Sequence, residues 1–180
     1  MLIDVSSLTQ LTAAVLAGAG VAAVDAVLVA ESLVAADVEG VSSHGVALLP
    51  LYVERLKAGG VVVDAVPQIT EDLGGLVVMT ARHVLGQISS RIAVNLAAER
   101  AAVHGISMVT VRNAFHFGTA GFWAKALAAQ GMIGFAFSNT RPLMPAPGGA
   151  QRVVGNNPLA AAFPSGTGAP LVVDMAMSAT

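Results

Sequence analysis

The stretch that most constrains the fold is residues 106–118, where a strand-like run passes into a loop and then a helix. The run is short, apolar and rich in β-branched side chains, which predicts a buried strand. The loop carries Asn113, then His116 between two phenylalanines, then Gly118, and a helical pattern over residues 119–130 follows. A titratable imidazole at such a junction suits chemistry near a bound anion. A histidine that only caps the strand and bonds its own loop stays an open alternative.

Three apolar patterns of helical spacing occupy the N-terminal third of the chain. The expected helices cover residues 7–17, 21–38 and 47–57. Ser6 or Ser7 can cap the first of them. Together they predict an N-terminal helical region over residues 1–66.

Strand and helix patterns alternate through the rest of the chain, residues 67–180. The expected elements are a hairpin of strands 68–72 and 76–80, a helix at 89–104, the junction described above, and strands at 132–137, 159–163 and 169–173. Helices mixed with sheets in this way are typical of the α/β (α+β) fold class.

Gly18-Ala19-Gly20 and the residues after it match the G-x-G-x-x-A variant of the dinucleotide-binding fingerprint. That fingerprint requires a strand before its first glycine. Residues 8–17 are instead rich in alanine and helical in pattern. We therefore interpret the glycines as a corner between two helices.

Composition bounds the possible partners. The chain is 55% hydrophobic and 11% charged, with a mean hydropathy of +0.74. Its long uncharged stretches, residues 5–24 and 153–173, are interrupted by polar residues, prolines or glycines, so we expect no membrane span. A net charge of −2 with scattered basic residues gives no nucleic-acid footprint. So apolar a chain predicts a surface buried against a partner.

Cysteine is absent, which excludes disulfides and thiolate metal sites, and we identify no metal site of another kind. The chain opens Met1-Leu2-Ile3-Asp4 without a basic segment, so we expect no secretory signal. Both observations fit a cytoplasmic protein, which is the location we expect.

Ser43 directly precedes His44 in a polar loop ahead of the third helix. A hydroxyl in that place can orient the imidazole or relay a proton for it. Ser43 as a simple helix cap, with His44 incidental, is the alternative. We interpret His104 as a helix-end residue and assign His83 no role.

Four motifs occur in order along the chain: Ser42-Ser43-His44-Gly45-Val46, Asn113-x-x-His116-Phe117-Gly118, Gly155-Asn156-Asn157-Pro158 and Asp174-Met175-Ala176-x-Ser178. Together they resemble the type-2 malate/L-lactate dehydrogenase family, which also holds ureidoglycolate and sulfolactate dehydrogenases and a piperideine-2-carboxylate reductase. The resemblance covers nearly all of the chain.

The resemblance implies a fold that is not Rossmann. Residues 1–66 would form a helical, substrate-side region, and residues 67–180 part of a nicotinamide-cofactor domain with a mixed, mostly antiparallel sheet. The family works as a dimer of chains roughly double this length, so the chain resembles an N-terminal half. A homodimer, or a complementing C-terminal half on the same or a second polypeptide, is the implied partner.

The implied reaction is hydride transfer between NAD or NADP and a small 2-hydroxy or 2-oxo acid. Reduction of a cyclic imino acid by NADPH, and a non-catalytic fragment or subunit, stay open as alternatives. Ser43 and His44 match a relay hydroxyl and a proton-donating imidazole. His116 matches a histidine that is the acid/base in some members and lies beside the nicotinamide in others. The sequence does not rank the two histidines.

Further residues match cofactor and substrate contacts of the family. The cofactor-binding matches are His116, Phe117, Gly118, Thr119, Ala120, Asp174, Met175 and Ala176. Tyr52 matches a substrate-side tyrosine. Thr140 follows an expected strand at the end where ligand-binding groups collect in α/β sheets, so it is a third candidate for substrate binding.

Leu48 is the main departure from the family pattern. Four residues after the motif histidine the family usually carries an arginine, suited to a bidentate grip on a carboxylate. Leu51 also stands where arginine is common. Losing a charged hydrogen bond weakens binding by on the order of 1.5–3 kcal/mol. Either the substrate differs, or another cation such as Arg55 acts instead, or activity has been lost.

Overall fold

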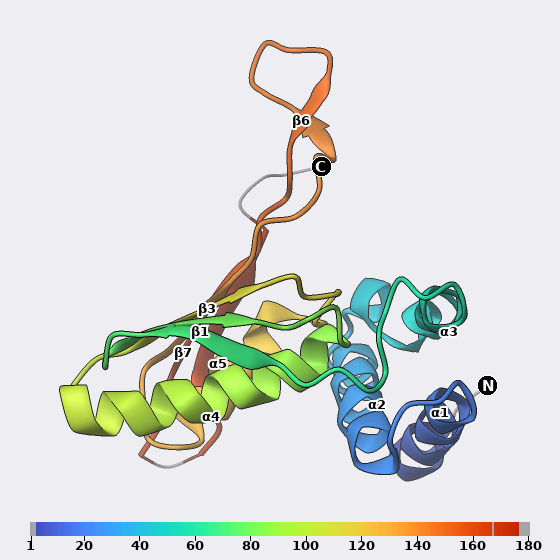
Figure 1. The fold of residues 1–180 in the computed structure, drawn as a ribbon, viewed down its shortest axis with the longest axis horizontal. Coiled ribbons are helices and arrows are strands. Elements are labelled where there is room, and N and C mark those ends of the chain that lie inside the picture. Colours follow the sequence, from blue (N-terminus) through green and yellow to red (C-terminus); the bar gives the residue numbers. More distant parts are fainter. Residues whose placement is uncertain (1–2, 167, 177–180) are drawn as a thin grey trace. The chain divides into compact units, whose positions relative to one another are not determined.

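The computed structural model describes residues 3–166 and 168–176 (Figure 1). The chain divides into two compact units, Met1–Thr119 and Ala120–Thr180. The expected boundary between a substrate-side and a cofactor region, at 66/67, falls inside the first unit. That functional division stays a prediction.

Helices α1 (Val5–Gly18) and α2 (Ala23–Val38) form the predicted corner. The α1 cap is Asp4, whose Oδ2 accepts the backbone N–H of Ser7 at 2.9 Å, so the predicted cap at Ser6 or Ser7 is wrong. The chain turns at Gly20, whose φ of +96° favours glycine. Because a helix precedes the glycines where the dinucleotide fingerprint needs a strand, the helix-corner interpretation is confirmed.

Two short 3₁₀ helices, η1 (Ser42–His44) and η2 (Val46–Leu48), lead into α3 (Leu49–Lys57). The helices enclose an apolar core that also takes residues from the loop before α4. Its most buried members are Leu16, Ala26, Val29, Leu33, Tyr52, Ala81, Val84 and Leu85.

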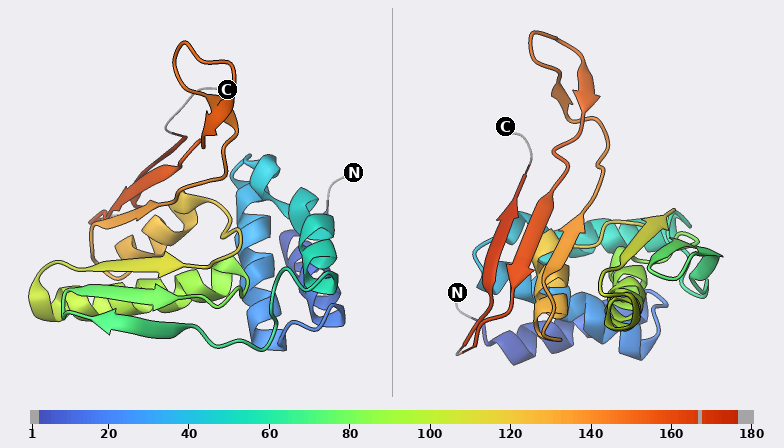
Figure 2. Two further views of the ribbon diagram at one scale, coloured as in Figure 1. Left: turned by 45° about the horizontal axis from the view of Figure 1, so that its top comes forward. Right: turned by 90° about the vertical axis from the view of Figure 1, so that its left-hand side faces the viewer.

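The sheet of the first unit has the order β1-β2-β3, with bounds Gln68–Asp72, Leu76–Thr80 and Met108–Arg112. β1 and β2 form the predicted antiparallel hairpin, whereas β2 and β3 are parallel. Helix α4 (Gly86–His104) makes the crossover and runs along the sheet (Figure 1; Figure 2), where Val77 and Met79 are buried. The prediction of a buried strand at the junction is wrong, because β3 is an edge strand here and Met108 is 51% exposed.

The second unit contains helix α5 (Ala120–Ala128) and an antiparallel sheet of order β4-β7-β8, with bounds Gly134–Phe137, Leu159–Phe163 and Leu171–Met175. The small residues Gly134, Ala160 and Ala162 are buried. A Cβ on Gly134 would overlap the backbone of Ala124, so α5 packs closely on the sheet. A two-stranded ribbon, β5 (Met144–Pro145) and β6 (Arg152–Val154), projects from the connection in which we expected only a loop (Figure 2).

The register of β4, β7 and β8 places apolar side chains together on the other face of this sheet. We call it the open sheet face; it comprises Phe135, Phe137, Leu159, Ala161, Phe163, Leu171, Val173 and Met175. Phe137 is 58% exposed and Leu171 is 68% exposed. Contiguous exposed apolar surface of this kind is typical of an interaction site.

The α/β class is confirmed: the described residues form one mixed sheet, one three-stranded antiparallel sheet and the two-stranded ribbon. Among residues 3–166 and 168–176, no helix has the length and apolar character needed to span a membrane. Within the same residues, no group of three or more histidine, aspartate or glutamate side chains could hold a metal ion.

Candidate active site

Ser43 and His44 lie together in η1, where the Ser43 Oγ is 3.0 Å from the His44 Nδ1. The alternative in which Ser43 is a simple cap is wrong, because neither η1, η2 nor α3 has a side-chain cap. The hydroxyl therefore contacts the imidazole. It is placed to orient the ring through its Nδ1.

Asp37, which the sequence did not single out, anchors this loop. Its Oδ2 accepts the backbone N–H of Val46 at 2.8 Å. A Cβ on Gly45 would overlap the Asp37 carboxylate, so only glycine fits between α2 and the loop. An acid in the last turn of a helix is unfavourable beside the helix dipole, and that signal could have marked Asp37 for another role.

His116 is held from behind by groups of α3, α4 and its own loop. The Tyr52 hydroxyl lies 2.7 Å from the His116 Nδ1, and the Gly118 N–H donates to the same atom at 3.3 Å. The Gln87 Nε2 donates to the Tyr52 hydroxyl oxygen at 2.9 Å. Tyr52 and Gln87 are both completely buried, and the Tyr52 ring packs edge-on against Phe115.

The start of α4 approaches this loop at van der Waals distance. A Cβ on Gly86 would overlap the carbonyl oxygens of Phe115 and His116, so glycine permits the close packing that brings Gln87 beneath the ring. The sequence did not identify Gly86 or Gln87 as site residues. A polar Gln between Leu85 and Ile88, at the start of a helix, is the signal that could have found them.

The two imidazoles are neighbours, with ring centroids 5.4 Å apart and an angle of 36° between their planes. Burial, and to a smaller extent the charge of His44, lower the pKa of His116 to about 4, so His116 is neutral near pH 7. Burial also raises the pKa of the Tyr52 phenol, which keeps its hydroxyl proton.

Both histidines are held through Nδ1, and in the part of the chain that the structure describes neither Nε2 atom has a hydrogen-bond partner. The Gly118 N–H can only donate, so the His116 Nδ1 that faces it is an acceptor, and the ring proton of neutral His116 is on Nε2. The pair thus offers one N–H donor and one titratable imidazole to a small molecule.

The predicted substrate residues Leu48 and Tyr52 lie in the same unit as the two histidines, but neither side chain is largely exposed. Leu48 is half-buried and packs against the apolar core. Tyr52 is buried completely, with its hydroxyl on His116. Arg55 is exposed on α3.

The remaining predicted residues group within the second unit. The Thr140 hydroxyl donates to the Asn156 Oδ1 at 2.8 Å, and its N–H to the Asn157 Oδ1 at 3.0 Å. The Asp174 Oδ2 accepts the Gly121 N–H at 2.7 Å and so caps the N-terminus of α5. Met175 is 48% exposed, and Ala176 ends the described stretch, so Ser178 of the fourth motif lies outside the described residues.

Of the predicted cofactor stretch, His116 and Phe117 are half-buried, and Gly118, Thr119 and Ala120 are buried. A Cβ on Gly118 would lie 2.7 Å from the Ser32 Oγ, which explains glycine at that position together with its φ of +85°.

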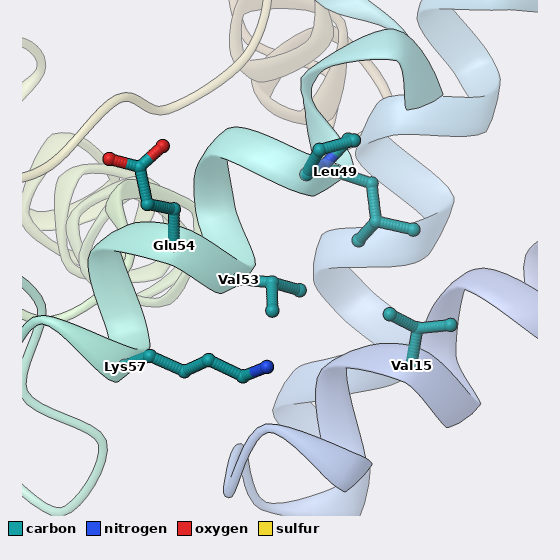
Figure 3. A pocket seen from close by; sticks show the side chains of 6 residues that line it. Val15, Leu49, Val53, Glu54 and Lys57 are labelled. Carbon is teal, nitrogen blue, oxygen red and sulfur yellow. The ribbon is translucent and has the colours of Figure 1, made fainter.

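A pocket of about 510 Å³ between α1 and α3 contains none of these residues (Figure 3). It is lined by Val15, Leu49, Pro50, Val53, Glu54 and Lys57. Its walls are mainly apolar, and its charged lining residues, Glu54 and Lys57, are not among the residues that the sequence motifs predict.

The model of the malate/L-lactate dehydrogenase family matches residues 3–180. Malate dehydrogenase of Pyrococcus abyssi is 39% identical over 154 residues, which cover 86% of this chain and 42% of the relative. An enzyme of Chromohalobacter salexigens named (2R)-3-sulfolactate dehydrogenase (NADP(+)) is 33% identical over 98% of this chain and 53% of its own length. The chain spans about half the length of the curated relatives it matches.

Solved structures agree with the sequence comparison. Malate dehydrogenase from Pyrococcus horikoshii OT3 superposes with a TM-score of 0.95 at 36% identity, over 99% of this chain and 51% of the other. Δ1-Piperideine-2-carboxylate reductase from Pseudomonas syringae pvar. tomato gives a TM-score of 0.91 at 26% identity, over 100% of this chain and 54% of the other.

Proposed function

Because the chain belongs to the malate/L-lactate dehydrogenase family, we propose that it carries the acid/base residues of an enzyme that oxidises small 2-hydroxy acids and reduces 2-oxo acids. The observation that supports this best is the pair of imidazoles, 5.4 Å apart, each held at Nδ1. Each ring keeps its Nε2 for a bound molecule.

In this proposal His44 moves the proton. When a 2-hydroxy acid is oxidised, the His44 Nε2 takes the hydroxyl proton as C2 loses a hydride, and in reduction the same atom returns a proton to the carbonyl oxygen. An imidazole suits this task because its pKa lies near the working pH. Ser43 orients the ring through Nδ1, at 3.0 Å.

His116 takes the complementary part. Since its pKa is lowered to about 4, it is a neutral N–H donor at the pH of the reaction. Its Nε2–H would hold an oxygen acceptor, either the substrate oxygen or the carboxamide of a nicotinamide, and so fix the acceptor beside His44.

The residues fit a nicotinamide cofactor at this point, because a half-buried N–H donor with no partner among the described residues suits a carboxamide oxygen. When bound, NAD or NADP supplies or accepts the hydride. His116, Phe117, Gly118, Thr119 and Ala120 are the stretch we propose for its binding. We also propose Met175, Ala176 and Asp174 as cofactor-side residues; Asp174 would act through the start of α5, which it caps.

A second candidate function, reduction of a cyclic imino acid by NADPH, is favoured by two observations. The chain resembles the piperideine-2-carboxylate reductase structure over its whole length. Leu48 puts an apolar group where an arginine would grip the carboxylate of a 2-oxo acid. In that reaction His44 would protonate or orient the amine nitrogen.

We also propose that the working enzyme is a cytoplasmic homodimer in which further polypeptide covers the open sheet face. Relatives about twice as long as the matched region, and exposed side chains such as Phe137 and Leu171, support this. Within the second unit, we propose Thr140, which donates hydrogen bonds to Asn156 and Asn157, as a substrate-binding residue.

The test is a substrate panel with the complete enzyme that contains this chain. Quenching or enhancement of NADH and NADPH fluorescence measures cofactor binding, and 2-oxo acids and cyclic imines are then compared by kcat/KM. We expect cofactor binding and turnover of at least one class. Binding of neither cofactor, with no turnover, would reject the dehydrogenase proposal; turnover of imines alone would favour the second candidate.

A further inference from the structure

The hydrogen bonds behind His116 run in one direction, and a main-chain group sets that direction. The Gly118 N–H can only donate, so the His116 Nδ1 that faces it at 3.3 Å is an acceptor. The Tyr52 hydroxyl proton then goes to the same Nδ1, which at 2.7 Å is closer than the His116 carbonyl oxygen at 3.3 Å. With its proton committed, the Tyr52 oxygen is free to accept, and Gln87 supplies the N–H at 2.9 Å.

We propose that Gln87 and Tyr52 are positioning residues that hold neutral His116 in the Nε2–H tautomer, so that His116 presents a donor to the bound molecule. The proposal rests on the proposed function only for the identity of that molecule as substrate or cofactor. It assigns Tyr52 a place behind the histidine in place of the expected direct contact with substrate.

The unusual burial of Gln87 supports this role. Its side chain is completely buried, its Nε2 serves Tyr52, and its Oε1 has no partner within the described residues. Burying an unpaired carbonyl oxygen is unfavourable, whereas an apolar residue at the same place would avoid that penalty. The amide is explained if its N–H is needed to keep the Tyr52 proton directed at His116.

The titratable groups that face His116 are His44 from η1 and Tyr52 from α3. Gln87 lies one step further back and does not titrate. A change at position 87 therefore affects His116 through the Tyr52 hydroxyl. A glutamate there would reverse the direction of the hydrogen bonds between positions 87, 52 and 116. Its carboxylate accepts from Tyr52, and the Tyr52 oxygen must then accept from a protonated Nδ1.

Ser32 offers a matched control. It lies on α2, is completely buried, and its Oγ has no partner within the described residues. It also borders the same loop, since a Cβ on Gly118 would lie 2.7 Å from its Oγ. Ser32→Ala thus removes a buried polar group beside the loop of His116. It leaves the hydrogen bonds of Gln87, Tyr52 and His116 in place.

The experiment is a titration of histidine ¹⁵N-labelled complete enzyme by two-bond ¹H–¹⁵N NMR, which distinguishes the two tautomers. We expect wild type and Ser32→Ala to show Nε2–H for neutral His116. Gln87→Glu should move the proton to Nδ1 once the carboxylate ionises, and raise the pKa of His116 by about one unit or more. In kinetics, Gln87→Glu should raise the KM of the molecule bound by His116 about ten-fold.

Two further variants test the proposal if Gln87→Glu does not fold, and test whether its effect passes through Tyr52. If Gln87→Glu does not fold, Gln87→Leu fills the same space with an apolar side chain. It should give a measurable Nδ1–H population of His116. In a Tyr52→Phe background, Gln87→Glu should no longer affect His116. Wild-type tautomer and titration in the folded Gln87 variants, or an equal change in Ser32→Ala, would overturn the proposal. The NMR signal needs no turnover, so an inactive enzyme would count against the proposed function alone.

Discussion

The first unit buries polar groups beside its candidate site, whereas the second gathers exposed apolar groups on one face of its sheet. In the first, Tyr52, Gln87 and Ser32 are completely buried beside the candidate site. In the second, Phe137 and Leu171 are more than half exposed on the open sheet face. The buried hydrogen bonds of Gln87 and Tyr52 constrain direction as well as distance, so this part of the first unit can orient His116. The second unit, by contrast, provides a surface that other polypeptide can cover.

The largest expected effect tests whether the chemistry resides in the first unit. His44→Asn should lower kcat and kcat/KM together by about 10²–10⁴-fold, because a proton-transfer group acts in the transition state. His116→Asn should chiefly raise KM. Steady-state rates over a range of pH measure both.

His83→Asn is the control, because His83 is exposed in a turn with φ of +65°, a conformation that Asn also tolerates. If His44→Asn keeps a normal kcat while His116→Asn loses it, the two roles are reversed. If neither changes the rate, the dehydrogenase proposal itself fails.

Acid should destabilise the first unit selectively. His116 has a folded-state pKa near 4 against an ordinary value of 6.5, so the unfolded chain binds its proton first as the pH falls. The contribution of His116 to stability is complete above about pH 6.5 and declines toward pH 4, by at most about 1.4 kcal/mol per pH unit.

All four histidines lie in the first unit, at positions 44, 83, 104 and 116, and none lies in residues 120–180. Urea denaturation between pH 7 and pH 4.5, followed by hydrogen exchange, should show the loss in the first unit. In His116→Gln the slope should flatten. An unchanged slope would mean that burial of this ring does not couple to folding.

Leu48→Arg asks whether the first unit has lost a carboxylate contact. The arginine should lower the KM for 2-oxo acids about ten-fold, since a charged hydrogen bond contributes on the order of 1.5–3 kcal/mol. Leu48 also packs on the core, so thermal unfolding should show a stability loss on the order of 1 kcal/mol. No gain in kcat/KM for any 2-oxo acid would exclude a vacant carboxylate site at this position.

The smallest change in folding free energy is expected on the open sheet face. Phe135→Lys with Val173→Lys should alter the stability of the 180-residue chain by only about 0.5 kcal/mol per site, because both side chains are exposed. The same pair should remove most binding of a hydrophobic dye and reduce self-association of this chain in sedimentation.

Val103→Lys, at a 75% exposed position on α4, is the control and should change neither. A wild-type chain that sediments as a stable monomer and binds no dye would remove the contrast between the two units.

The elements that the sequence predicted best are those set by local patterns. The α1–α2 corner follows from helical spacing around Gly20, and the β1–β2 hairpin from two short strands around Gly74-Gly75. His44 and His116 were identified because each stands in a short, recognisable loop. Their assignment as a neighbouring pair needed the structure, because 72 positions of sequence separate loops that only packing of the helices brings together.

Other features were missed because they depend on contacts distant in sequence. Gln87 bonds a residue 35 positions away, and Tyr52 one 64 positions away, so no local pattern marks either contact. The exposure of β3 was also hidden, since an apolar run gives a strand but not its place at the edge of a sheet. The Asp4 cap was displaced by only two or three residues from the predicted serines, within the usual uncertainty of helix ends.

The main-chain donor at Gly118 has a consequence for how such a site can change under mutation. Only proline lacks a backbone N–H, and proline cannot adopt the φ of +85° found here. Every other substitution retains the donor, and each would place a Cβ against Ser32. Substitution at position 118 therefore cannot remove the backbone hydrogen bond to His116. Substitution of Tyr52 or Gln87, by contrast, can remove the side-chain hydrogen bonds that hold the ring. A single substitution at position 87 can therefore change the tautomer and the pKa of His116 during evolution, whereas no substitution at position 118 can do so by removing the donor.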